Sequence, residues 1–146
     1  MMLFRKHNDN SITALRDIPG IVVGCPSRGD DAATMLRTMM ALAKVDGRVC
    51  AFLEPIALYM AKDLHAPGDG GWLTEYPSPE HAMTLGEERV YNPQATDCVI
   101  FTFGNGVPMS LRAAREIEKQ HGWKVRVVDL RWLVPLNHAA IARHAG

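Results

Sequence analysis

The sequence predicts an α/β fold built from two partial units, in each of which helices cover parallel strands. Short apolar segments rich in β-branched residues alternate with segments of helical periodicity, and this alternation occurs twice. Between the two occurrences, residues 64–96 have no sustained period and are rich in proline and glycine, as in a linker or crossing segment. The aromatic residues of this segment, Trp72, Tyr76 and Tyr91, suggest that it is pinned to a surface.

The first unit is predicted as a short helix followed by strand, helix and strand. Residues 11–17 (SITALRD) make about two helical turns, which the following Pro-Gly pair ends. Residues 21–24 (IVVG) are typical of a buried strand. The clearest helix spans 27–47, with two aspartates at its start, a lysine near its end and apolar residues at helical spacing. Residues 49–55 (VCAFLEP) form the second strand, so we expect a parallel βαβ unit.

The second unit repeats this order after the crossing segment. Residues 97–104 (DCVIFTFG) form a strand, and a helix then begins near Pro108 and ends at Gly122. Residues 123–130 (WKVRVVDL) form the next strand, and 137–146 (NHAAIARHAG) a further helix. Two half-sized units therefore fit the pattern better than one complete domain.

Length and composition limit the function classes. The chain has 146 residues, of which 47% are hydrophobic and 22% charged, enough for a real core in one ordinary domain or in pieces of two. Basic and acidic residues are equal in number, 16 of each, which favours neither nucleic acid nor an acidic membrane as partner. No apolar run approaches the roughly 20 residues that span a bilayer. The start, MMLFRK, is too short for a signal peptide, so a cytoplasmic protein is expected.

Cysteines and histidines predict no metal site. Cys25, Cys50 and Cys98 are widely spaced and form no C-x-x-C pair, so we expect buried, reduced thiols rather than a disulfide framework or zinc site. Of the six histidines, His138 and His144 lie six apart on a predicted helix and therefore point to different faces.

Two glycine-containing motifs are similar to parts of known cofactor-binding motifs. GDG at 68–70 is the opening of a thiamine diphosphate–magnesium motif, but the Asn pair that should follow is absent, since Asn92 precedes Pro93. A turn aspartate at Asp69 is the preferred interpretation. FGNGVPM at 103–109 follows a strand and opens a helix, as a dinucleotide-binding loop does.

The dinucleotide interpretation has weaknesses. Met109 stands where the third glycine belongs, and Pro108 removes an N–H that would face a phosphate. Asp129, at the end of the next strand, occupies the place of a ribose-binding acid. We prefer a glycine-rich turn, and a small nucleotide-binding protein resting on Gly104 and Gly106 is the weakest alternative.

His7 is the one histidine whose context suggests chemistry. It lies in a polar run ahead of the first helix, which fits a surface arm, a helix cap or the end of an active-site loop. The Pro19-Gly20 pair follows it twelve residues later. Next in order come CPSRGDDAATML and FLEPIALY, and further on DCVIFTFGNGVPMSLRAA and VRVVDLRWLVPLN.

This ordered set resembles the thiamine diphosphate-dependent 2-oxo acid dehydrogenases, in the beta-subunit-like part of their decarboxylating component, within the transketolase-like superfamily. The resemblance implies two partial three-layer α/β/α units. Residues 1–63 would be the C-terminal half of a pyrimidine-binding-like domain, 64–96 a linker or crossing segment, and 97–146 the first part of a transketolase C-terminal-like domain.

The resemblance implies oxidative decarboxylation of a 2-oxo acid with acyl transfer to a lipoyl partner. His7 matches the family histidine that reaches the thiamine site, where an imidazole can orient substrate and exchange protons. Glu54 matches a Glu-Pro position that we interpret as structural and paired. Asp46 falls near a monovalent-cation site of some members, but Arg48 replaces an oxygen ligand there, so no ion is predicted.

The resemblance also implies cofactors and partners. Thiamine diphosphate and Mg²⁺ would serve the intact enzyme, but none is expected for the isolated chain, because the activating glutamate and the diphosphate-binding domain have no counterpart in this sequence. A homologous or alpha-like subunit would complete the site, and a lipoyl-bearing acyltransferase would accept the acyl group. We expect an oligomeric enzyme and an inactive, self-associating isolated chain, since sheet edges would be exposed.

Two other hypotheses remain open. One is a noncatalytic assembly module that docks through the methionine-rich helix and the 64–96 segment. The other is a relative of transketolase or deoxyxylulose-phosphate synthase.

Overall fold

The computed structural model describes residues 12–146, so His7 lies outside the described residues. The predicted order of helices and strands is confirmed, with two short strands and one helical turn added. The elements are α1 (Ile12–Arg16), β1 (Val22–Gly24), α2 (Gly29–Val45), β2 (Cys50–Phe52), the 3₁₀ turn η1 (Ile56–Leu58), β3 (Arg89–Tyr91), β4 (Cys98–Thr102), α3 (Gly106–His121), β5 (Val125–Asp129), β6 (Trp132–Val134) and α4 (His138–Ala145).

The strands form two three-stranded sheets, in the orders β2-β1-β6 and β3-β5-β4. The two predicted parallel pairs, β1 with β2 and β4 with β5, are both present. Each sheet also has an antiparallel strand that was not predicted, β6 beside β1 and β3 beside β5. Strands β1 and β2 are equally short but lie in longer apolar runs, whereas β3 follows charged residues and β6 is followed directly by Pro135, so the sequence does not indicate these two strands.

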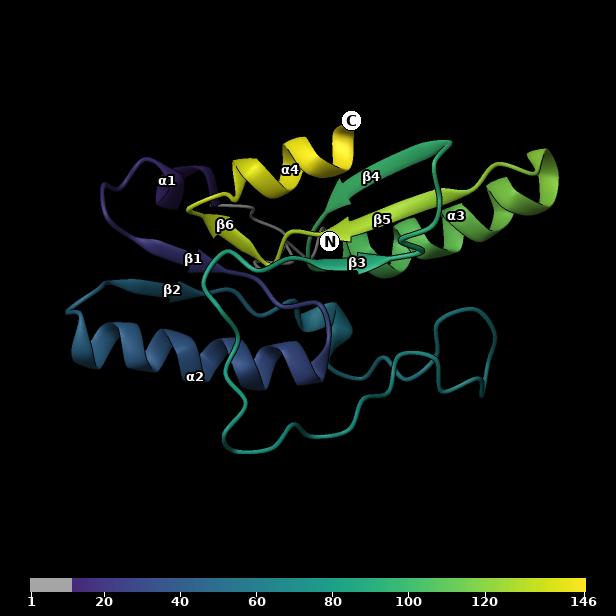
Figure 1. Ribbon diagram of the computed structural model, residues 1–146. Coiled ribbons are helices and arrows are strands. Elements are labelled where there is room, and N and C mark those ends of the chain that lie inside the picture. The colour runs from purple at the N-terminus through teal and green to yellow at the C-terminus, as the bar shows by residue number, and fades with distance from the viewer. Residues whose placement is uncertain (1–11) are drawn as a thin grey trace, which may run out of the picture.

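Strand β6 connects the two halves of the chain. It comes from the second half but pairs with β1, where Val134 lies opposite Val23 and Trp132 opposite Gly24. In Figure 1, α2 lies below β1 and β2, while α4 lies above β6. The first sheet is thus built from both halves, and the C-terminal ends of β1 and β5 face a common region. The predicted division at residues 64 and 96 stays a prediction.

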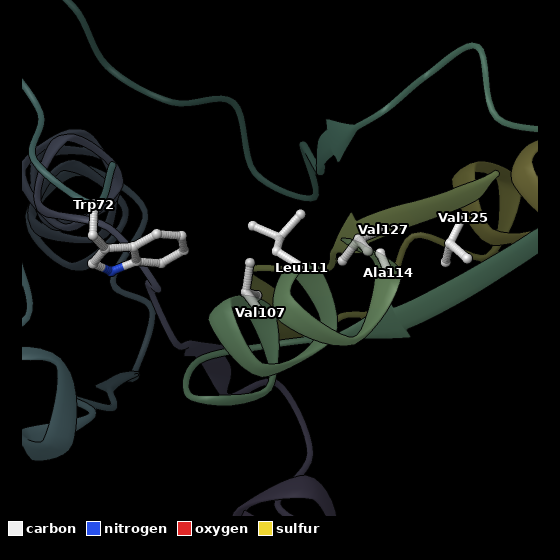
Figure 2. Close-up of a cluster of buried hydrophobic side chains, with 6 residues drawn as sticks. All are labelled: Trp72, Val107, Leu111, Ala114, Val125 and Val127. Carbon is white, nitrogen blue, oxygen red and sulfur yellow. The ribbon is translucent and has the colours of Figure 1, made fainter. Parts of the chain in front are cut away.

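Each sheet has its own hydrophobic core. The first core lies between α2 and the sheet β2-β1-β6, where Trp132 is 1% exposed and is packed with methionines of α2. The second lies between α3 and β5 (Figure 2). Helix α3 ends at Gly122, whose left-handed φ of 73° is readily adopted by glycine, as predicted. The members of the second core are Trp72, Val107, Leu111, Ala114, Val125 and Val127.

The crossing segment packs against both cores. Trp72 is buried, as expected for an aromatic residue that pins the segment to a surface. Tyr76 does not follow that expectation, since 79% of its surface is exposed, although the Arg37 guanidinium lies over its ring. Arg37 Nη1 also donates hydrogen bonds to the carbonyls of Ser78 and His81, at 2.5 and 2.7 Å. The segment therefore wraps α2 and carries β3 to the second sheet.

Two further expectations can be compared with the fold. Cys25 is buried as predicted, but Cys98 is exposed because it begins an edge strand, so that prediction was wrong. In the part of the chain from Ile12 onward, no helix combines the length and the apolar character that a membrane crossing requires.

Candidate functional site

Charged residues converge at the junction of the two sheets, where the chain leaves β1 and β5. The loop after β1 carries Ser27 into the start of α2, whose first turn contains Asp31. Strand β5 ends at Asp129, and Arg131 lies in the turn before β6. The backbone joins these segments, since Cys25 N donates to the carbonyl of Arg131 at 2.8 Å. This pairing brings the two loops together, and their polar side chains meet in the interior.

A buried ion pair forms the centre of this cluster. Arg131 Nη1 lies 2.7 Å from Asp31 Oδ1, and their side chains are 4% and 2% exposed. Arg89 approaches the same carboxylate at 3.1 Å and Asp30 at 2.7 Å. Burial raises the pKa of Asp31, and the two guanidinium groups oppose that rise. Removing one partner of such a pair is costly because the other charge stays buried.

Arg131 also fastens the crossing segment. Its Nε donates to the carbonyl of Glu87 at 3.0 Å, and its Nη2 to that of Glu88 at 2.8 Å. Its backbone has a φ of 56°, a left-handed conformation that non-glycine residues adopt at a cost of about 1 to 3 kcal/mol. A single side chain thus connects α2, the crossing segment and the β5–β6 turn.

Asp129 is a second buried carboxyl in the cluster, and none of its surface is exposed. Ser27 Oγ donates to its Oδ2, and the Arg131 backbone N–H donates to its Oδ1 at 3.2 Å. Burial raises the pKa of Asp129 to about 7, and the nearby Asp31 carboxylate adds to that rise. Burial and the charge of Asp129 together raise the pKa of the Cys25 thiol to about 12. The Cys25 thiol is therefore protonated and unreactive at neutral pH.

Two cavities flank the cluster. A polar cavity of about 380 Å³ has Asp30, His81, Glu87 and Arg89 among its lining residues. A larger one, of about 530 Å³, opens beside the C-terminal ends of β1 and β2. The second contains a stacked pair, with the Arg28 guanidinium 4.9 Å from the centre of the Trp72 ring. Both are lined by fixed polar groups, but neither gathers a metal-binding set.

Glu54 lies at the larger cavity in the place predicted for a structural acid. It follows β2, and its Oε2 accepts a hydrogen bond of 2.5 Å from the Tyr59 hydroxyl. This bond raises the pKa of Tyr59. Glu54 thus follows a strand and accepts a hydrogen bond, and its structural role stays a prediction.

The FGNG turn is explained by packing. Gly104 has a φ of 52°, and a Cβ there would lie 3.1 Å from Cys25 Sγ. A Cβ on Gly106 would overlap Thr102 Oγ1. Asp129, the candidate ribose-binding acid, is fully buried and bonded to Ser27. These contacts support the glycine-rich turn and leave Asp129 unable to reach a nucleotide.

The GDG segment is a structural turn, as preferred from the sequence. The Asp69 carboxylate accepts four backbone N–H groups, from Leu64, His65, Ala66 and Gly71, at 2.7 to 2.9 Å. These bonds hold the pKa of Asp69 well below its usual range. Within residues 12–146 there is no group of three or more His, Cys, Asp or Glu that could hold a metal ion.

The central ion pair between Asp31 and Arg131 could not be predicted from the sequence. Asp31 was interpreted only as a helix-start acid, and Arg131 only as part of the Asp-Leu-Arg motif. The two residues lie 100 positions apart, so no local spacing connects them. The only available signal was that both belong to segments that carry the family resemblance.

Comparisons with known proteins agree with this architecture. Residues 87–146 match the family model described as transketolase, C-terminal domain. The beta subunit of 3-methyl-2-oxobutanoate dehydrogenase from Mycobacterium tuberculosis (strain ATCC 25618 / H37Rv) is 30% identical over 138 residues, covering 93% of this chain and 34% of the relative. The pyruvate dehydrogenase E1 component subunit beta of Staphylococcus aureus is 31% identical over 131 residues, covering 90% and 35%.

Two further proteins share parts of this similarity. The 1-deoxy-D-xylulose-5-phosphate synthase of Bacillus licheniformis is 33% identical over 126 residues, covering 86% of this chain and 17% of the synthase. A solved split-gene transketolase, described as an inactive beta4 tetramer, has the same fold with a TM-score of 0.59 and 22% identity, over 89% of this chain and 37% of that one.

The chain spans about a third of the length of the dehydrogenase subunits that it matches. Residues 87–146 are therefore similar to a transketolase C-terminal domain, and most of the chain is similar to a part of the beta subunits of two 2-oxo acid dehydrogenases.

Proposed function

We propose that this chain is part of a thiamine diphosphate-dependent 2-oxo acid dehydrogenase. The reaction would be oxidative decarboxylation of a 2-oxo acid, with the acyl group passed to a lipoyl group on a partner protein. The observation that carries the proposal is the similarity to beta subunits of two different dehydrogenases over 90% or more of this chain. Because the chain spans about a third of those subunits, the activity belongs to the complete enzyme and not to this chain alone.

The cofactors of the complete enzyme would be thiamine diphosphate and Mg²⁺. The described residues do not fit a magnesium–diphosphate site, since the Asp69 carboxylate is already occupied by four backbone N–H groups. In the proposal, the cofactor is held by regions that correspond to the part of the relatives that this chain does not span. The isolated chain is expected to bind neither.

The proposed partners follow from the same relatives. Two of them are named as beta subunits, and the solved neighbour is described as a tetramer. We therefore expect an oligomer in which an alpha-like or homologous subunit completes the site and a lipoyl-bearing acyltransferase accepts the acyl group. The equal numbers of acidic and basic residues, 16 each, favour neither nucleic acid nor membrane as a partner. The proposed compartment is the cytoplasm.

His7 is the proposed catalytic residue of this chain. Its imidazole would orient the substrate and exchange protons near the cofactor, since its unperturbed pKa of about 6.5 permits both protonation states near neutrality. This role rests on the spacing between His7 and Pro19-Gly20 and on the family resemblance.

The proposal can be tested in a chimaera. The matching segment of the M. tuberculosis beta subunit is replaced by this chain, and the subunit is assembled with its own partner. His7→Ala should lower decarboxylation or lipoyl acylation at least tenfold while the assembly and its thermal midpoint persist. His65→Ala, a change of the same kind at an exposed position, is the matched control and should leave both rates unchanged. Equal rates for His7→Ala and the control would remove His7 from the site.

A second candidate function is that of a deoxyxylulose-phosphate synthase relative. It is favoured by the 33% identity to the B. licheniformis synthase, although this chain covers only 17% of that protein. The two candidates differ in product. A chimaera that forms 1-deoxy-D-xylulose 5-phosphate, and does not acylate a lipoyl domain, would favour the synthase.

A further inference from the structure

The charges at the sheet junction do not balance when every group is ionised. Three guanidinium groups lie 2.7 to 3.8 Å from three carboxylates at this junction. The six groups belong to Arg28, Arg89, Arg131, Asp30, Asp31 and Glu87, and as ions they neutralise one another. Asp129 lies in the same interior and would add an uncompensated negative charge.

The contacts of Asp129 do not supply a cation. Its two oxygens receive one hydroxyl, from Ser27, and one backbone N–H, from Arg131, whose guanidinium is directed to Asp31 and the crossing segment instead. A carboxylate with no exposed surface and no direct ion pair is costly to leave ionised.

Among residues 12–146, no cationic side chain makes a direct ion pair with Asp129. The titratable or charged side chains of the surrounding cluster are Cys25 and Arg28 after β1, Asp30 and Asp31 of α2, Glu87 of the crossing segment, Arg89 and Tyr91 of β3, and Arg131 in the β5–β6 turn. Burial raises the pKa of Tyr91, and its hydroxyl stays neutral at physiological pH.

We propose that Asp129 is a proton-binding site that joins the two sheets, holding a proton while the junction is closed and releasing it when the junction opens. In the protonated form, the cluster is electrically neutral, and Asp129 can also donate a hydrogen bond. When the proton is lost, the buried negative charge repels Asp31 and weakens the contact between the loop after β1 and the β5–β6 turn. The junction is then looser at alkaline pH than at mildly acidic pH.

The direction of the pH dependence follows from linkage. The pKa of Asp129 is about 7 in the folded chain, against an ordinary value of 3.8. Between these two values the folded chain holds more protons than the unfolded chain, so stability falls as the pH rises and levels off above the folded value. A shift of this kind lowers the folding equilibrium constant up to about tenfold for each pH unit, and by about fiftyfold between pH 5 and 7 because the slope halves at the folded pKa.

The test measures both the proton and the stability of the full chain. The side-chain carboxyl carbon of Asp129, labelled with ¹³C and assigned through its couplings to the backbone of Asp129, is titrated by NMR from pH 4.5 to 9. A midpoint between 6 and 8 is expected. Ser27→Ala should raise that midpoint further, because the Ser27 hydroxyl stabilises the ionised form. A carboxyl that is fully ionised at pH 5 would overturn the proposal.

Unfolding by urea provides the second measurement. Across pH 5 to 8, Asp129→Asn should lose less stability than the wild type, and it should exceed the wild type at pH 8. The asparagine amide can keep both contacts, accepting from Arg131 N and donating to Ser27 Oγ. The readout is the difference between the two proteins, so that contributions common to both cancel. Asp17→Asn, at a side chain that is 70% exposed, is the matched control and should follow the wild type.

Equal pH dependence of the wild type and Asp129→Asn would contradict the proposal. Should Asp129→Asn fail to fold, the titration of the wild-type carboxyl still decides.

Discussion

The buried ion pair between Asp31 and Arg131 leads to the sharpest stability prediction. Arg131→Met keeps the length of the side chain but removes the guanidinium that lies 2.7 Å from the Asp31 carboxylate. Asp31 would then face only Arg89, and the carbonyls of Glu87 and Glu88 would lose their donor. Removing one partner of a buried pair costs about 3 to 5 kcal/mol. This loss is a large part of the roughly 5 to 15 kcal/mol that stabilises an ordinary domain.

The double variant Asp31→Leu/Arg131→Met provides the check. Replacing both partners by apolar side chains leaves no isolated charge at the pair, and Arg89 keeps its contact with Asp30 at 2.7 Å. The double variant should therefore recover most of the stability that the single variant loses. Urea unfolding at pH 7, followed by the fluorescence of Trp132, which is 1% exposed beside the cluster, measures both variants. A loss below about 1 kcal/mol in the single variant, or a double variant no more stable than the single one, would refute the reasoning.

Two other predictions concern the glycine motifs. Gly106→Ala places a Cβ against Thr102 Oγ1 and should lower the free energy of unfolding, measured by thermal unfolding, by about 1 to 3 kcal/mol. The double variant Gly106→Ala/Thr102→Ala should recover part of that loss. No loss of stability in the single variant would contradict the packing explanation. Asp69→Ala removes the acceptor of four backbone N–H groups, so hydrogen exchange should accelerate at His65, Ala66 and Gly71. Exchange in α3 should stay unchanged. Unaltered protection of the loop amides would show that Asp69 does not hold the turn.

The alternation of strands and helices could be predicted because each element carries its own signal. Helix α2 has apolar residues at helical spacing and acids at its start, and Gly122 marks the end of α3. Strands β3 and β6 lie in no long apolar run and carry no such signal. Their places are set by partners far away in the chain, Val127 to Asp129 for β3 and β1 for β6. Tertiary pairing, not local propensity, decides these strands.

The candidate site could be predicted less well, for the same reason. Asp31 at a helix start has an adequate local explanation, and nothing nearby in the sequence indicates a partner 100 residues later. Asp129 fits a ribose-binding position from its place at a strand end, and only its burial shows that it faces the interior. The catalytic role of His7 was inferred from the family resemblance, and it stays a prediction because His7 lies outside residues 12–146.

The most direct test of the proposed function is the activity of the chimaeric dehydrogenase that carries this chain in place of the matching beta-subunit segment. Release of CO₂ from a 2-oxo acid is measured with and without added thiamine diphosphate, together with acylation of a lipoyl domain. The proposal predicts cofactor-dependent release and acylation, both reduced by His7→Ala and unaffected by His65→Ala. A chimaera that assembles with its partner and retains its thermal stability, but releases no CO₂, would contradict it.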